Sequence, residues 1–273
     1  MICADSSNDA GLILALNGAD ERLQYVLGRL PAPQDADAGA AGAPEATLAA
    51  SQEWTMPGQA MRFLAPGIGN MLEGLGASAK DIKRIACVQG PGSFTGLRMS
   101  LALAEGLAAG NGAALAGLDH LALLAHEAAQ TVSGAVLALS WSRRGQVYAQ
   151  AFQGEAALTP PSVVYLAAMA DFLAPLPRPL FVLGGGLRRN LPIFQDLAIK
   201  DTGLRLLPSL WDAPRPQTLL TLAARAHFGP GPLLPMYLRA SDAEDNLASI
   251  AAGRGLSESA AQEILARGSR TLS

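Results

Sequence analysis

The sequence predicts an α/β protein made of two successive halves, each a sheet with helices packed against it. Short apolar runs of strand character alternate along the chain with longer segments of helical periodicity. Half of the 273 residues are apolar and 16% are charged, which is enough for one large or two modest hydrophobic cores. A disordered or fibrous protein does not fit this composition.

The first elements are three predicted strands that form an antiparallel meander. They cover Ile2 to Asp5, Leu12 to Leu16 and Leu23 to Leu30, and turn-forming Ser, Asn, Asp and Gly residues separate them. In residues 31–50, fourteen of the twenty positions are Ala, Gly or Pro. Because such a segment has too few large apolar groups for a core, residues 31–53 are predicted to be a flexible surface insertion.

The remainder of the first half alternates helix and strand. Apolar spacings of three and four from Pro57 to Leu75 predict a helix, which Pro66 should weaken or kink. A buried strand is predicted at Ile85 to Gln89, a long helix at Phe94 to Ala109 and a further strand at Ala113 to Gly117. Residues 1–117 are therefore expected to form the first domain.

A second run of elements predicts a second domain over residues 118–239, followed by a polar tail at 240–273. Two strands form a hairpin around a turn that contains Arg143 and Arg144, and a later strand ends at three consecutive glycines. The predicted elements are a helix at Leu118–Ala129, strands at Ala135–Ser140, Gln146–Gln153 and Pro179–Leu183, and helices at Arg189–Ile199 and Gln217–His227.

Composition and charge limit the classes of function. The net charge of −3 and the lack of a basic stripe argue against a chain that grips nucleic acid by itself. The start of the sequence has no secretory signal pattern, and no apolar run reaches the roughly 20 residues that span a bilayer. Cys3 and Cys87 lie in apolar runs and are interpreted as buried thiols. We therefore expect a cytoplasmic protein that is not attached to a membrane.

The stretch QGPGSFTGLR, residues 89–98, combines glycines with a helix start. Ser93 or Thr95 can cap the helix, and such a start can bind an anion. A Walker-type loop needs Lys after its last glycine, but Leu97 and Arg98 follow Gly96 here. A nucleophile elbow needs a glycine two residues after Ser93, where Thr95 stands. A sharp entry into a packed helix is therefore favoured over phosphate binding or nucleophilic catalysis.

The helix from Phe94 to Ala109 carries only two charges, Arg98 and Glu105, which lie on one face. A helix with so little solvated surface is buried on nearly all sides. Gly92, Gly96, Ser100, Ala104 and Ala108 recur at every fourth position; we call them the small-residue row. One side of the helix would pack on its own sheet and the other on a second protein, and the alternative is a purely internal helix.

Other candidate sites have simpler interpretations. Asp5, Ser6 and Ser7 follow the first predicted strand, where a nucleotide's metal could be held, but no basic phosphate ligand follows, so a turn is favoured. His120 and His126 are six residues apart and lie on different helix faces, which disfavours a metal site. The glycines at 184–186 suit a tight strand-to-helix turn.

The stretch from Ala86 to Ala125, which contains the QGPGSFTGLR motif, resembles the signature of the bacterial TsaB family, also called YeaZ. Weaker similarity covers most of the chain. It includes Asp5-Ser6-Ser7, the segment from Arg143 to Tyr148 and the late motif from Pro235 to Arg239. Three features depart from the family: Ala60 and Met61 occupy the positions of a frequent His-Ser pair, and both the 31–50 insertion and the polar tail after Arg239 are unusual.

The resemblance implies two tandem actin-like (ribonuclease H-like) domains and a non-catalytic accessory subunit for threonylcarbamoyladenosine in tRNA. It implies the paralogous catalytic subunit TsaD as partner, the ATPase TsaE as a third component, and contact with tRNA through the complex. It implies no catalytic residue and no metal site in this chain, no tightly bound cofactor, and ATP or ADP with magnesium only within the complex. A homodimer is expected when the chain is alone.

The interface implied by the resemblance lies on the two helices around the motif. The expected interface residues are Ala60, Leu64, Ile68, Gly92, Phe94, Gly96, Leu97, Arg98, Ser100, Leu101, Ala104 and Glu105. Two alternatives stay open from the residues alone. One is a stand-alone ATPase or phosphotransferase on an actin-like fold, and the other is a metallopeptidase-like protein.

Overall fold

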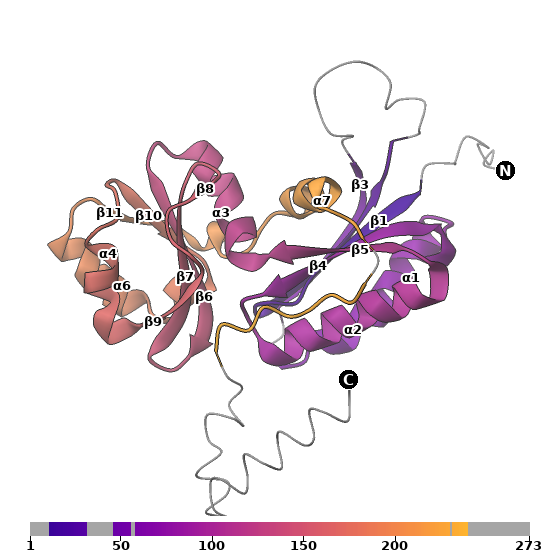
Figure 1. The fold of residues 1–273 in the computed structure, drawn as a ribbon, viewed down its shortest axis with the longest axis horizontal. Coiled ribbons are helices and arrows are strands. Elements are labelled where there is room, and N and C mark those ends of the chain that lie inside the picture. The colour runs from indigo at the N-terminus through magenta and orange to yellow at the C-terminus, as the bar shows by residue number, and fades with distance from the viewer. Residues whose placement is uncertain (1–10, 32–45, 56–57, 230, 240–273) are drawn as a thin grey trace, which may run out of the picture. The chain divides into compact units, whose positions relative to one another are not determined.

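The computed structural model describes residues 11–31, 46–55, 58–229 and 231–239 and contains two mixed sheets (Figure 1). The predicted strand at Ile2 to Asp5 and the predicted tail at 240–273 lie outside the described residues. The other predicted strands and helices are confirmed, with ends that differ by a few residues.

The first sheet has five strands in the order β3-β2-β1-β4-β5. β1 pairs antiparallel with β2 and parallel with β4, while β2–β3 is antiparallel and β4–β5 is parallel. The strands are β1 (Leu12–Asn17), β2 (Arg22–Arg29), β3 (Thr47–Thr55), β4 (Ile82–Gly90) and β5 (Ala114–Asp119).

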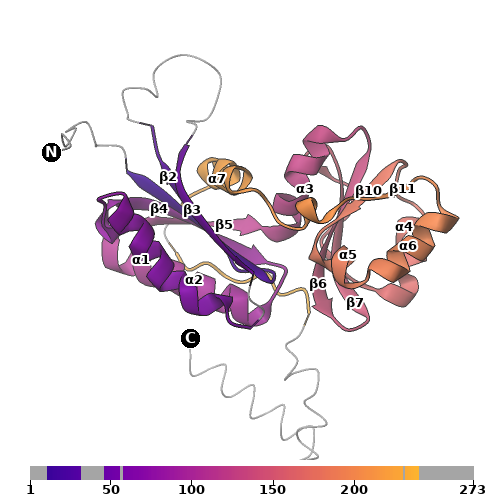
Figure 2. The ribbon, with the colours of Figure 1, turned by 180° about the vertical axis from the view of Figure 1, so that it is seen from behind.

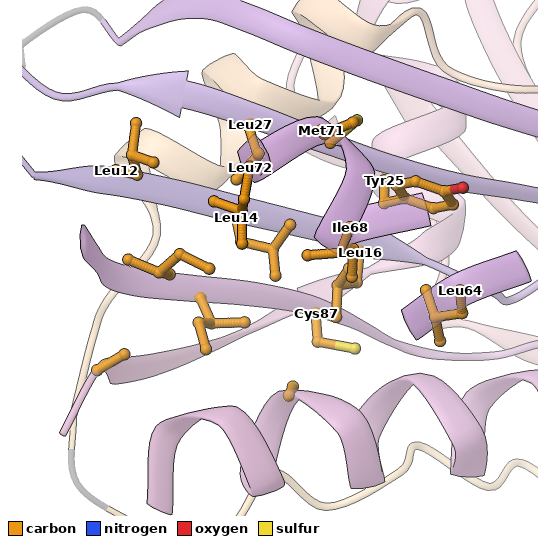
Figure 3. Close-up of a cluster of buried hydrophobic side chains, with 14 of the residues drawn as sticks. Leu12, Leu14, Leu16, Tyr25, Leu27, Leu64, Ile68, Met71, Leu72 and Cys87 are labelled. Atoms are coloured by element: carbon orange, nitrogen blue, oxygen red, sulfur yellow. The ribbon is translucent and has the colours of Figure 1, made fainter. Parts of the chain in front are cut away.

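The central strand β1 is buried on both faces because helices cover the sheet on both sides (Figures 1 and 2). Successive side chains of a strand alternate between the two faces. Leu12, Leu14 and Leu16 pack with residues of α1 (Leu64–Gly74) and α2 (Phe94–Asn111), as Figure 3 shows for α1. Ile13 and Ala15 pack on the other face with α7 (Pro216–Arg225).

The second sheet repeats this topology, in the order β11-β10-β6-β7-β8, with β9 paired to β7. Its first strand, β6, is antiparallel to β7 and parallel to β10, as β1 is to β2 and β4. The two tandem actin-like domains are thereby confirmed. The strands are β6 (Ala135–Arg143), β7 (Gln146–Gln153), β8 (Ala156–Ala157), β9 (Ser162–Tyr165), β10 (Leu180–Leu183) and β11 (Leu204–Leu206).

Helices of the second half build a core with this sheet. Met169, Leu187 and Phe194 come from successive helices and are fully buried against it. α3, by contrast, contacts β6 and β7 as well as α7. The helices are α3 (His120–Thr131), α4 (Met169–Leu173), α5 (Gly185–Arg189) and α6 (Leu191–Lys200), with short 3-10 helices η1 (Ala60–Phe63), η2 (Ala79–Asp81), η3 (Leu166–Ala168) and η4 (Ser209–Trp211).

The predicted flexible insertion at residues 31–53 is wrong in its last part, because β3 begins at Thr47. β3 pairs along its length with β2 at the edge of the sheet. An edge strand leaves much of its surface in water, so it needs few large apolar residues. Leu48 and Trp54 are its only large apolar side chains, which explains why its composition resembled that of a loop.

The predicted second domain, residues 118–239, is also wrong in its last part. α7 belongs by sequence to this range, yet Leu219 and Leu220 are buried in the core of the first sheet. Leu220 packs against Gly28 of β2 so closely that a Cβ there would meet its methyl groups. Further along, Gly229 forms a bridge with Leu115. The first domain is therefore built from two separate parts of the chain.

Candidate protein-binding surface on helices α1 and α2

The QGPGSFTGLR motif connects β4 to α2 and packs on the end of β1. Gly90 closes β4 with a φ of 126°, a conformation that favours glycine. The Ser93 hydroxyl accepts a hydrogen bond from the Gly96 amide at 3.3 Å and so caps α2. The Ser93 amide donates to the Ala19 carbonyl at 2.6 Å. The loop is thus the sharp helix entry that the sequence favoured.

The small-residue row faces the first sheet of its own chain. A Cβ on Gly92 would collide with the carbonyl oxygen of Ala19, and a Cβ on Gly96 with that of Gly18. Ser100 and Ala104 are fully buried. These residues therefore let α2 approach the end of β1. Gly96, Ser100 and Ala104 are buried against the chain itself and offer a partner almost no surface, whereas Gly92 and Ala108 stay partly exposed.

Most of the other predicted interface residues are also internal. Leu64 and Ile68 of α1 and Leu97 and Leu101 of α2 have at most 5% of their surface exposed. Ala60 begins η1, and its side chain lies outside the described part of the structure. The apolar side chains of these two helices form the chain's own core.

Phe94 and Arg98 lie at the start of α2 and are accessible. The Arg98 guanidinium lies 3.8 Å from the centroid of the Phe94 ring, a cation–π contact. Arg98 is exposed and Phe94 is partly buried. Of the predicted interface residues on α2, this pair lies where a second protein can reach it.

Glu105 has an internal role that the sequence did not indicate. Its carboxylate accepts a hydrogen bond from the Leu233 amide at 2.6 Å. Nearby, the Gln89 side chain donates to the Leu234 carbonyl at 2.8 Å, and its backbone carbonyl accepts from the Met236 amide at 2.8 Å. Glu105 and Gln89 therefore hold residues 233–236 along α2 and the end of β4.

Apart from Glu73 and Arg98, the exposed residues of α1 and α2 are uncharged and mostly small. Both helices lie on the same side of the first sheet (Figures 1 and 2). Gly69 and Gly106 face open space, with no atom within 4 Å of a Cβ placed on either. We call this surface the outer face and define it as Ala65, Pro66, Gly69 and Asn70 of α1 together with Met99, Ala102, Gly106 and Ala109 of α2.

The outer face has the properties of a helix-packing surface. Met99 is 45% exposed and is its largest side chain, while the small residues around it leave the helix backbones open to close approach. The sequence contained this signal, because residues 99, 102, 106 and 109 recur at spacings of three and four. It was missed because the small-residue row is more regular and was assigned to the partner.

Buried titratable groups lie away from the outer face. Burial raises the pKa of Asp20 to about 6, and it lowers the pKa of His120 to about 4. The Cys87 thiol is fully buried, and this burial raises its pKa. Burial also raises the pKa of Asp119. None of these four residues lies in the outer face.

Asp5, Ser6 and Ser7, the predicted nucleotide-binding residues, lie outside the described residues. Over residues 11–31, 46–55, 58–229 and 231–239, no group of three or more His, Cys, Asp or Glu side chains is placed to hold a metal ion. In the same part of the chain, no helix is both long and apolar enough to cross a membrane. Gly184 has a φ of 102° at the start of α5, consistent with a tight turn.

Comparison with known proteins gives matches that are named for threonylcarbamoyl modification of tRNA. A family model described as TsaD, tRNA N6-adenosine threonylcarbamoyltransferase, matches residues 60–170. The protein TsaB of Bacillus subtilis, named for tRNA threonylcarbamoyladenosine biosynthesis, is 28% identical over 188 residues, 66% of this chain and 79% of the relative. TsaB of Escherichia coli is 35% identical over 99 residues, 36% of this chain and 42% of the relative.

Solved structures agree on the fold. YeaZ from Pseudomonas aeruginosa is 22% identical with a TM-score of 0.57, and the similarity covers 84% of this chain and all of that one. A second structure, described as similar to peptidase YeaZ from the same species, is 23% identical with a TM-score of 0.58 and the same coverage. The repeated topology and these similarities define a protein of two actin-like domains. The sequence relatives among these matches are proteins named TsaB, to which this chain is similar over 66% and 36% of its length.

Proposed function

We propose that this chain is a non-catalytic subunit of the system that makes threonylcarbamoyladenosine in tRNA, and that its outer face docks on the paralogous TsaD. The names of the TsaB relatives and the match to the TsaD family model support the pathway. The observation that carries the docking proposal is the uncharged, small-residue surface that α1 and α2 present together.

The composition of the outer face favours a helical partner. Small residues such as Ala102 and Gly106 allow a second helix to approach closely, because no side chain holds the two backbones apart. Met99 supplies an adaptable apolar side chain on this surface, and the exposed Arg98 next to it in the sequence provides a charge. An isolated chain would cover the same surface with a second copy, which is the expected homodimer.

The remaining components belong to the assembled complex. TsaE joins the pair of chains, tRNA is contacted through the complex, and ATP or ADP with magnesium is bound only there. Threonylcarbamoyl transfer takes place in TsaD. In this proposal the present chain acts in the cytoplasm and contributes surface and stability to the assembly.

Co-elution with TsaD from the same genome tests the docking surface. Gly106→Arg places a long charged side chain at an open position of the outer face, so we expect co-elution to be lost while the variant stays folded. Ala157→Arg makes the same kind of change at an exposed position on β8 and should leave co-elution unchanged. Normal binding by a folded Gly106→Arg variant would contradict the proposal.

The non-catalytic role has a separate test. The isolated chain is mixed with ATP, magnesium and tRNA, and hydrolysis and threonylcarbamoyl transfer are measured with and without TsaD. We expect neither activity without TsaD. Turnover by the isolated chain would instead support the stand-alone ATPase or phosphotransferase alternative.

A further inference from the structure

Asp20 lies in the turn between β1 and β2, and one of its carboxylate oxygens is buried without a hydrogen-bond partner among the described residues. Its Oδ1 accepts a hydrogen bond from the Glu21 amide at 2.8 Å. Its Oδ2 is inaccessible to water and receives no hydrogen bond from any residue that the structure describes. Gly185 of α5 lies directly against this oxygen, since a Cβ there would collide with it. One oxygen of this first-domain carboxylate is thus covered by the backbone of the second domain.

The charged groups of α5 are already engaged by other carboxylates. Arg188 donates two hydrogen bonds to Asp212, at 2.6 and 2.9 Å. Arg189 forms an ion pair with Glu21, from the same turn as Asp20. These two arginines therefore leave Asp20 without a cation of its own, although Glu21 and Arg189 also join the two domains.

On the side of the first domain, Arg22 is also paired with a carboxylate other than that of Asp20, and a cavity opens this region to solvent. Arg22 lies 3.7 Å from Glu53 of β3. A cavity of about 260 Å³ borders Asp20, Arg22 and Thr55 on one side and Gly185 on the other. Water can therefore reach the edge of this contact, so a small separation of the turn from α5 would hydrate Asp20.

We propose that Asp20 is a proton switch between the two domains. When its carboxyl is neutral, the β1–β2 turn stays packed on Gly185. When it is ionised, the turn and α5 separate, because a buried charged oxygen without a donor is costly and hydration removes that cost. The proton moves between the Asp20 carboxyl and water through the adjacent cavity.

The electrostatics agree with this geometry. Burial is the largest cause of the raised pKa of Asp20, about 6; Arg189 and Arg22 lower it and Asp212 raises it. The carboxyl therefore changes charge in the range where cytoplasmic and mildly acidic conditions differ. With an ordinary pKa in the open form, the closed form should become about tenfold less favoured between pH 5 and pH 8.

Hydrogen–deuterium exchange of the full chain between pH 5 and pH 8 tests the switch, with rates corrected for their intrinsic pH dependence. We expect opening of residues 184–190 and 18–22 to rise about tenfold across this range in the wild type. Asp20→Asn keeps the shape and cannot ionise, so both segments should stay protected at every pH. The switch is wrong if the wild type shows no change, or if Asp20→Asn shows the same change.

Two further variants and one control variant keep the test decisive if Asp20→Asn does not fold. Gly185→Ala pushes Asp20 away, so opening should be high and independent of pH, whereas Gly74→Ala faces open space and should behave as the wild type. Glu21→Gln removes the ion pair with Arg189, so opening should rise at all pH values while the pH dependence remains. An unchanged pH dependence in Gly185→Ala would overturn the proposal.

Discussion

At the scale of single residues, two buried titratable groups act on stability in opposite directions. Both ring nitrogens of His120 are buried and have no hydrogen-bond partner among the described residues. Its lowered pKa, about 4, means that the unfolded chain takes up this proton first as the pH falls. Asp20 behaves in the opposite way, because its raised pKa means that the folded chain binds the proton first.

These opposing shifts predict that the contributions of His120 and Asp20 to the pH dependence of stability nearly cancel between pH 6.5 and pH 4. Protonation of His120 in the unfolded chain costs about 3 kcal/mol of stability over this range, and protonation of Asp20 in the folded chain restores about as much. His120→Leu removes the first effect, so we expect that variant to gain stability as the pH falls. Asp20→Asn removes the second effect, so we expect that variant to lose stability as the pH falls.

Urea denaturation at several pH values measures both effects. The wild type serves as the reference, and each variant is compared with its own stability at pH 7. If His120→Leu and Asp20→Asn respond to pH in the same direction, the assignment of the two opposing groups is wrong.

Neither residue could be assigned this behaviour from the sequence. The two histidines at 120 and 126 were weighed there only for their spacing as metal ligands, and Asp20 appeared as one polar residue of a turn. Their pKa values depend on burial by residues far away in the chain, such as Gly185 against Asp20. Periodicity shows where a residue stands along an element and not what covers it.

At the scale of elements, α2 was predicted with nearly its observed bounds, but its orientation was not. The pattern identified a helix with almost no charged surface, which was correct. It could not decide which of two uncharged sides meets the sheet, because glycine and alanine occur on both. The close approach of Gly96 to the Gly18 carbonyl settles the question.

This orientation predicts unequal effects of two matched glycine substitutions in α2. Gly96→Ala inserts a methyl group against the end of β1, so we expect a loss of about 1–3 kcal/mol in the free energy of unfolding. Gly106→Ala points into open space and should add up to about 1 kcal/mol, since alanine favours a helix. Thermal and urea unfolding of the two variants give the comparison; equal effects would contradict the inward orientation.

At the scale of the whole molecule, the first domain depends on a helix from late in the sequence. α7 closes the face of the first sheet opposite α1 and α2, with Leu219, Leu220 and Ala223 fully buried. The sequence predicted α7 as a helix and placed it in the second domain by order alone. Chain order does not determine which sheet an amphipathic helix covers.

Leu220→Ala is therefore expected to destabilise the first domain by about 2–5 kcal/mol, although residue 220 lies in the predicted second domain. Hydrogen exchange should increase most in β1 and β2, because they lose the packing against Gly28. Leu210→Ala is the control: this side chain is 64% exposed, and its removal should change stability by less than about 0.5 kcal/mol. An increase confined to the second sheet would contradict the assignment of α7.

The position of α7 also means that the chain passes between the two domains twice, first where β5 runs into α3 and again before Pro216. A single backbone cut in either crossing leaves the domains joined by the other. Two crossings also oppose twisting of one domain about the other more than bending. No contiguous stretch of the gene encodes the first domain. The first domain therefore could not be gained, lost or exchanged as a single segment without the second domain.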